Sequence, residues 1–197
     1  MTASLCDLPV QAFARYADTI AMGEAWRKLT PSMFKQPFEF TACNVQYARC
    51  RTYFNPDSWH KSFLCICYEF DVPIEQIISH KPMLYGRTYM HGRSRAEFEA
   101  LTSPNGAHLV PELDMIVWHF PNDPQLPQLP ELLDANRVVQ HFPYASLPFP
   151  ADAIVDIKIE VLRYLAEQRC ILRYDISVGS NRDHFILYAK VFSDDNG

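Results

Sequence analysis

Proline is concentrated in one stretch of this 197-residue chain, and that stretch divides the strand-forming sequence into two parts. Seven of the fifteen prolines fall between residues 121 and 150. Proline restricts φ and has no amide hydrogen, so a proline-dense segment does not enter the interior of a sheet. We therefore expect a stiff, extended connector that runs over a surface. The predicted organisation is an N-terminal helical segment (1–38), a first strand unit (39–120), the connector (121–152) and a second strand unit (153–197).

Hydrophobic periodicity predicts the elements on both sides of the connector. A helical stripe extends from Pro9 to about Leu29, where Thr30-Pro31 supplies a stop. Alternating apolar residues predict strands at 40–47, 62–70, 83–89, 113–120, 156–164, 169–176 and 184–192. Short helices are expected at 95–101, with Ser94 as N-cap, and at 131–140. Together these elements predict an α+β fold that contains two antiparallel β-meanders.

The third strands of the two units match in residue type at six consecutive positions. Residues 84–89 (LYGRTY) and 187–192 (LYAKVF) both give leucine, tyrosine, a small residue, a cation, a β-branched residue and an aromatic residue. The match predicts an internal duplication, although two amphipathic strands can also resemble each other by chance. Under duplication each unit is a three-stranded meander, and the first is followed by a helix across one face.

Charge and cysteine spacing exclude several classes of protein. A net charge of −5 argues against a nucleic-acid binder with a broad basic surface. No apolar run approaches the roughly 20 residues that span a bilayer, and the first residues lack a secretory signal. We therefore expect a cytoplasmic protein with neither a nucleic-acid nor a membrane partner. The six cysteines lack zinc-ligand spacing, which favours buried, reduced thiols over a metal or redox site.

The order strand, strand, cation-bearing strand and helix is that of a kinase amino-terminal lobe. Residues 120–134, 161–174 and 188–197, with paired Arg-Tyr strands followed by the Lys190 strand, resemble the amino-terminal region of bacterial phosphotransferases of the aminoglycoside phosphotransferase and choline kinase type. The direct resemblance covers residues 120–197. It implies ATP-dependent phosphoryl transfer to a small-molecule hydroxyl, with Lys190 as the third-strand lysine that contacts the nucleotide phosphates.

Other cations of the second unit lie on the strands next to Lys190. Arg163, Arg169 and Arg173 are consistent with a basic-aromatic face that binds phosphates or RNA, and we name Arg163 and Arg173 with Lys190 as cofactor-binding candidates. The same arginines are consistent with a ladder of ion pairs, which we favour, to the acidic residues Glu160, Glu167 and Asp175. Lys190 taken alone is also consistent with a solvated strand lysine.

Arg87 takes the corresponding place in the first unit. An arginine is not a simple substitute for that lysine, so we expect the first unit to be a non-catalytic cap or docking copy. Glu97 or Glu99, on the helix that follows, is a candidate partner of Arg87, although glutamates on the surface of a helix are common.

The residues that complete phosphoryl transfer have no counterpart in this sequence. The family has its aspartate loop and metal-binding residues in a carboxy-terminal lobe, and no segment here matches them. The turn at 165–168 contains no glycine. We therefore expect an amino-terminal lobe of a small-molecule phosphotransferase, catalytically incomplete as this chain, that uses ATP with magnesium only when a carboxy-terminal lobe is supplied. The alternative is a non-catalytic binding or regulatory module that binds a protein partner through the edge of its second sheet.

Overall fold

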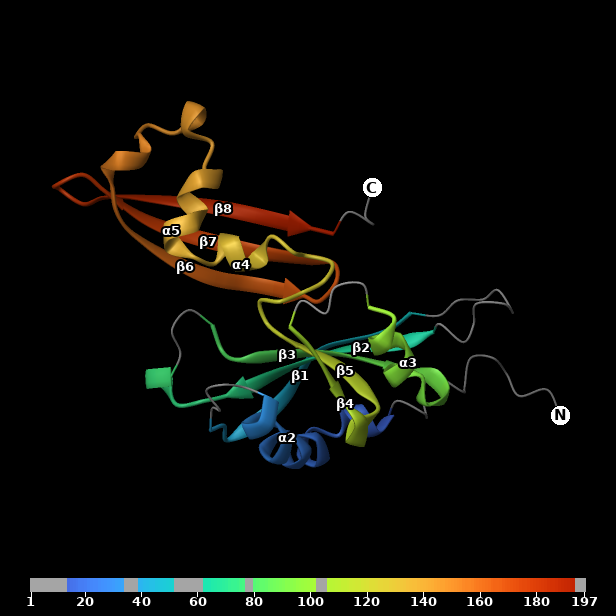
Figure 1. Ribbon diagram of the computed structural model, residues 1–197. Helices are drawn as coiled ribbons and strands as arrows, with labels where there is room; N and C mark the ends of the chain where they lie inside the picture. Colours follow the sequence, from blue (N-terminus) through green and yellow to red (C-terminus); the bar gives the residue numbers. More distant parts are fainter. Residues whose placement is uncertain (1–13, 34–38, 52–61, 77–79, 102–105, 194–197) are drawn as a thin grey trace. The chain divides into compact units, whose positions relative to one another are not determined.

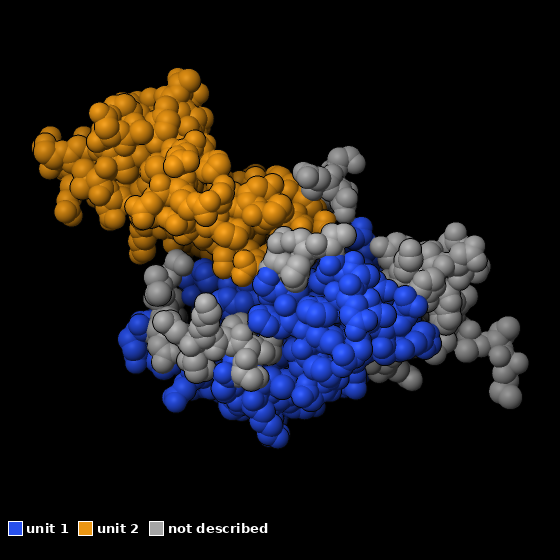
Figure 2. Space-filling view, viewed as in Figure 1, with its two compact units in different colours: residues 1–120 blue, residues 121–197 orange. Residues whose placement is uncertain are grey.

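The protein has an α+β fold that separates into two compact units, residues 1–120 and 121–197 (Figures 1 and 2). The structure is a computed structural model that describes residues 14–33, 39–51, 62–76, 80–101 and 106–193. The boundary between the units lies after Phe120, where the proline-rich segment begins. None of the helices in the described residues has the length and hydropathy needed to cross a membrane.

The first unit is built on a five-stranded antiparallel sheet in the order β1-β2-β3-β5-β4. Its strands are β1 (Ala42–Arg51), β2 (Phe63–Asp71), β3 (Met83–Tyr89), β4 (Ala107–Val110) and β5 (Met115–His119). The sequence pattern predicts four of these five strands and misses β4. A strand of four residues is too short to show an alternating pattern.

Helix α2 (Thr19–Met33) covers one face of this sheet (Figure 1). The helix runs through Pro31, so the predicted stop is wrong. Asp18 caps the start of α2, because its carboxylate accepts the amides of Ile20 and Ala21 at 3.1 and 3.0 Å. Trp26 on α2 is fully buried, and its ring packs edge-on against Tyr68 of β2 at 5.5 Å. The part of the predicted helix before residue 14 lies outside the described residues.

Helix α3 (Ser94–Glu99) follows β3, as the sequence predicts, but Ser94 is not its N-cap. Arg93 holds that position. The Ser94 side chain is buried, donates to the carbonyl oxygen of Asp114 at 2.6 Å and accepts the amide of Tyr89 at 3.2 Å. Ser94 therefore ties α3 to the end of β3 and to the turn before β5.

The second unit is a three-stranded antiparallel sheet in the order β6-β7-β8. Its strands are β6 (Ile154–Leu165), β7 (Arg169–Val178) and β8 (Asp183–Phe192). In β7 every even-numbered residue is buried and every odd-numbered residue is half-buried, so the two faces of the sheet have different environments.

The proline-rich segment covers one face of the β6-β7-β8 sheet (Figure 1). It is not an extended connector, and the predicted helix at 131–140 is two short helices, α4 (Leu129–Leu132) and α5 (Ala135–Val138), followed by single 3-10 turns. Tyr174 of β7 donates its hydroxyl to the carbonyl oxygen of Leu132 at 3.1 Å, and its ring lies 5.4 Å from Phe142. The segment therefore supplies the second layer of this unit's core.

Candidate functional site

The face of the β6-β7-β8 sheet that the proline-rich segment leaves uncovered carries most of the unit's cations. We call it the open face. Large apolar side chains of β8 are well exposed on it: Ile186 at 48%, Tyr188 at 63% and Phe192 at 49%. Exposed aromatic and basic side chains on one sheet face are typical of a binding surface.

The structure brings the three predicted cofactor-binding residues together on the open face. Arg163 of β6 lies opposite Ile171 of β7, and Ile171 lies opposite Lys190 of β8, so these residues form one row across the sheet. Arg173 lies in the next row, opposite Tyr188. With strands about 4.8 Å apart, the backbones of Arg163 and Lys190 are roughly 10 Å apart. Their long side chains can therefore reach the same bound anion.

Arg173 differs from Arg163 and Lys190 in having acidic partners nearby. The Arg173 guanidinium lies 3.3 Å from Glu160 Oε2 and 3.6 Å from Asp175 Oδ2, which confirms the predicted ion pairs with these two carboxylates. In the part of the chain that the structure describes, neither Arg163 nor Lys190 has a carboxylate within ion-pair distance, and both side chains are exposed. Arg163 and Lys190 are therefore the two cations of this row that have no described carboxylate partner and remain available to a ligand.

Arg169 adds a fourth cation to this end of the open face. It lies opposite Leu165 on one side and Phe192 on the other, one row beyond Lys190. Its Nε and that of Arg173 are buried without a hydrogen-bond partner among the described residues. Buried donors without a partner are uncommon in folded proteins.

The carboxyl group of Asp123 is bound at the turn between β6 and β7. The amide of Glu167, a residue with φ of 65°, donates to Asp123 Oδ2 at 2.8 Å. The same oxygen accepts the Tyr164 hydroxyl at 2.8 Å, and Oδ1 accepts the amide of Gln125 at 2.8 Å. Burial raises the pKa of the Asp123 carboxyl, and these hydrogen bonds oppose the shift. Because Asp123 already occupies the Glu167 amide, that amide is not a site for a ligand phosphate.

Sequence reasoning misses Asp123 as a partner of this turn. The residue is 44 positions from Glu167, and the run Pro-Asn-Asp-Pro signals only a local turn. Of the three acidic residues of the predicted arginine ladder, Glu160 and Asp175 form ion pairs with Arg173.

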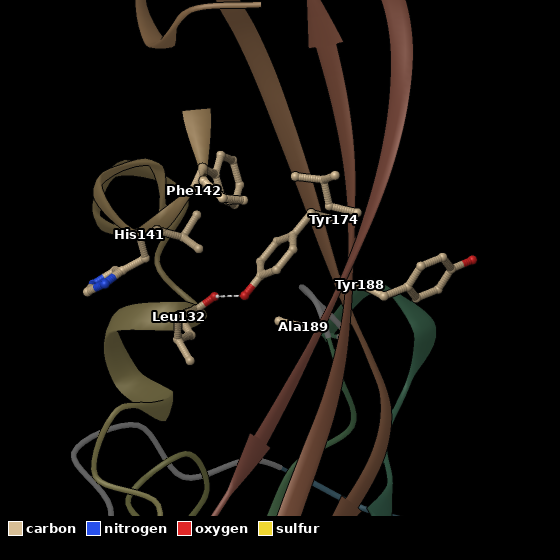
Figure 3. Close-up of a pocket in the computed structure, with 9 residues that line it drawn as sticks. Leu132, His141, Phe142, Tyr174, Tyr188 and Ala189 are labelled. Carbon is tan, nitrogen blue, oxygen red and sulfur yellow. Dashed lines mark hydrogen bonds between the residues drawn. The ribbon is translucent and has the colours of Figure 1, made fainter. Parts of the chain in front are cut away.

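A small cavity lies on the covered side of the same sheet, between the α4–α5 segment and strands β7 and β8 (Figure 3). Its volume is about 150 Å³ and its walls are mostly apolar, formed by side chains that include Leu132, Phe142 and Tyr174. The Tyr188 side chain points away from it, toward the open face. A space of this size holds a group no larger than benzene, so a nucleotide does not fit there.

In the first unit, Arg87 is surrounded by aromatic rings. Its guanidinium lies 5.1 Å from the ring centre of Phe63, 5.3 Å from Trp118 and 5.8 Å from Tyr85, and its Nε donates to the Tyr85 hydroxyl. Contacts of this kind stabilise a buried or half-buried arginine. Arg87 therefore packs within the sheet, whereas Lys190 is exposed.

The glutamate predicted to accompany Arg87 interacts elsewhere. Glu97 forms an ion pair with Arg93, the N-cap residue of α3, at 2.9 Å.

The cysteines are mostly buried, as predicted. Cys43, Cys65, Cys67 and Cys170 are buried, and burial raises the pKa of Cys43 and of Cys170 to about 12. Cys50 is exposed, which corrects the prediction for that residue, and Cys6 lies outside the described residues. Among the described residues, no group of three or more histidine, cysteine, aspartate or glutamate side chains is arranged to hold a metal ion.

No family model, curated protein sequence or solved structure matches the chain.

Proposed function

We propose that residues 121–197 are the nucleotide-binding, amino-terminal-lobe-like unit of a small-molecule phosphotransferase. The observation that carries the proposal is the position of Lys190. It lies on the third strand of an antiparallel meander, exposed on the open face, in one row with Arg163 and without a carboxylate partner among the described residues. Nucleotide phosphates are dense in negative charge, and charge-assisted hydrogen bonds from lysine and arginine bind them well.

The other charged groups of the open face support phosphate binding in this proposal. Arg173 is held by Glu160 and Asp175, so its position is fixed and part of its charge is balanced. Arg163 and Lys190 supply the unbalanced charge on the two sides of Ile171. Phosphate binding here depends on side chains, since the Glu167 amide is occupied by Asp123.

The first unit and the missing catalytic groups fit the same proposal. The first unit also has three meander strands followed by a helix, with an arginine in place of the lysine and packed among rings. We assign it the role of a non-catalytic copy. In this proposal the magnesium ligands and the aspartate that orients the hydroxyl substrate come from a carboxy-terminal lobe, as in the family that the sequence resembles. The proposal includes a cytoplasmic location, because ATP is available in the cytoplasm and free thiols stay reduced there.

The test is a titration of the full chain with ATP and with inorganic triphosphate, each with and without magnesium, by calorimetry and thermal shift. We expect both ligands to bind and to raise the melting temperature. Lys190→Ala removes one charge-assisted contact worth about 1.5–3 kcal/mol and should weaken binding by roughly 10- to 150-fold.

Lys158→Ala is the matched control. Lys158 is an exposed lysine of β6 on the same face, but it lies opposite Asp175, two rows away from Lys190. Its removal should leave the affinity for triphosphate within twofold of the parent. No binding by the parent chain, or an equal loss in both variants, would refute the proposed site.

A second candidate function is a non-catalytic binding or regulatory module. The turn between β6 and β7 favours it, because a carboxylate of the chain itself holds the amide where a nucleotide-binding lobe would leave donors open. This candidate predicts a folded chain that gives no response to ATP or triphosphate.

A further inference from the structure

The two third strands, β3 and β8, have matching neighbours as well as matching sequences. Leu84 of β3 lies opposite Tyr68, and Leu187 of β8 lies opposite Tyr174. The residues two positions further along also have matching neighbours: Gly86 lies opposite Ile66, and Ala189 lies opposite Leu172. The two strands therefore occupy equivalent places in their meanders.

Their outer edges differ. In the first unit the outer edge of β3 pairs with β5, antiparallel, from Leu84 opposite His119 to Arg87 opposite Ile116. In the second unit β8 is the last strand of its sheet, and no described residue pairs with its outer edge. The position that β5 fills beside β3 is thus open beside β8.

Each of the other edge strands in the described sheets has a feature that hinders pairing. β1 contains a bulge between Val45 and Tyr47, β6 contains two register shifts, and β4 is only four residues long. Bulges and short length are the usual protection of a free edge. β8 has neither: its ten residues pair with β7 without interruption and contain no proline. Long, regular and partly apolar edges are templates for another strand.

We infer that the outer edge of β8 is a docking site for an extended, apolar segment of a protein partner, which pairs antiparallel with Leu187–Lys190 as β5 pairs with β3. The inference uses the backbone edge of β8 and does not depend on nucleotide binding to the open face.

The first unit indicates the chemistry of this partner. Trp118 of β5 lies opposite Tyr85, with ring centres 5.0 Å apart and planes 15° apart, so an aromatic residue is expected opposite Tyr188. Ile116 lies opposite Arg87, so an apolar residue is expected opposite Lys190. One position must change. A Cβ at Gly86 would clash with the Met115 sulfur, and β8 has alanine at the equivalent position 189, so the partner needs a small residue in place of Met115.

The probe is a capped synthetic peptide of residues 113–120 with alanine at position 115 and two terminal lysines for solubility. Hydrogen exchange of the full chain, measured by mass spectrometry with saturating peptide, should show slower exchange over residues 183–192. The amides of β6 (154–165) are the internal control, because β6 is the other edge strand of the same sheet and its bulged outer edge should not gain protection.

Two N-methylated versions of the peptide, blocked at alternate residues, test whether the backbone makes the contact. A paired strand presents only one set of its amides to β8, so one version should lose binding at least tenfold and the other should keep it. Protection of β6 equal to that of β8, no protection of β8 at saturation, or equal binding by both N-methylated peptides would overturn the inference. A concentration-dependent dimer of the chain alone, with β8 protected, would also overturn it, because the occupant would then be a second copy.

Discussion

Replacing Asp123 should destabilise the second unit, because this carboxylate joins the proline-rich segment to the turn between β6 and β7. It is 3% exposed and accepts three hydrogen bonds, from Gln125, Tyr164 and Glu167, each at 2.8 Å. In Asp123→Ala all three donors lose their acceptor. A donor left without a partner costs about 1–3 kcal/mol, with the lower figure for the two part-buried amides. The expected loss in the free energy of unfolding is about 4 kcal/mol.

Asp123→Asn should cost about half as much. An amide oxygen in the place of Oδ2 keeps the bonds from Tyr164 and Glu167, while the new NH₂ group meets the Gln125 amide and that bond is lost. The free energy of unfolding should therefore decrease from the parent to Asp123→Asn and then to Asp123→Ala. This order follows from the number of hydrogen-bond acceptors that remain, and not from side-chain volume.

The same carboxyl should give the second unit a characteristic dependence on pH. Burial raises the pKa of Asp123 in the folded state. The folded protein therefore holds this proton more tightly than the unfolded chain, and the stabilisation is full below the ordinary carboxyl pKa and declines as pH rises through the folded value. The stability of the parent minus that of Asp123→Asn should be largest at acidic pH and should level off above the transition. Taking this difference removes the contribution of the other carboxylates.

The assay can separate the two units. All three tryptophans, at positions 26, 59 and 118, belong to the first unit. Tryptophan fluorescence during urea unfolding therefore follows the first unit, and hydrogen exchange of residues 154–178 follows the second. The Asp123 variants should lose protection in the second unit with the tryptophan transition unchanged. An alanine variant within 0.5 kcal/mol of the parent, or one no worse than asparagine, would refute the role given to this carboxylate.

Two further predictions concern the first unit. Gly86→Ala should lower the free energy of unfolding by about 1–3 kcal/mol, measured by urea unfolding with tryptophan fluorescence, because the new Cβ meets the Met115 side chain. In a double-mutant cycle, Met115→Ala should relieve part of the cost of Gly86→Ala. Purely additive effects of the two substitutions would contradict the clash. Burial, with His80 and His108 nearby, lowers the pKa of His119 to about 4. First-unit stability should therefore fall as pH decreases from about 6.5 to 4, by up to about 3 kcal/mol. His119→Gln should reduce this pH dependence of stability. An unchanged dependence in the variant would rule out His119 as its source.

The strands were predictable where alternation is long enough to reveal a face. The even–odd pattern of β7 and the apolar run of β2 are visible in the sequence and recur in the burial pattern. The proline-rich segment was not predictable in detail, because proline excludes sheet but permits the first turn of a helix. Pro130 lies in the first turn of α4, and that helix is only four residues long. A chain of single helical turns can therefore hold many prolines and still pack as a layer.

The candidate site was predictable in part: the sequence indicates its cations and the ion pairs of Arg173, but not the row in which Arg163 lies. Strand alternation in β7 places Arg173 on the face opposite the buried even-numbered residues, and the β7–β8 register places Lys190 on that same face. The position of Arg163 required the register shift next to Val161, which brings it opposite Ile171 and which no sequence pattern signals. Asp123 could not be predicted as the partner of Glu167, because the contact joins residues 44 positions apart.

The proposed anion site and the proposed docking edge use different parts of the same strand. Lys190 offers its side chain to the open face, while the outer edge of β8 offers backbone donors and acceptors. A strand paired on both sides loses the motions of a free edge, so the backbone beneath Lys190 is already ordered when an anion arrives. Less conformational entropy is then lost on anion binding. Because coupling between two ligands is reciprocal, a triphosphate bound by Lys190 and Arg163 would in turn strengthen the pairing of a partner strand with β8.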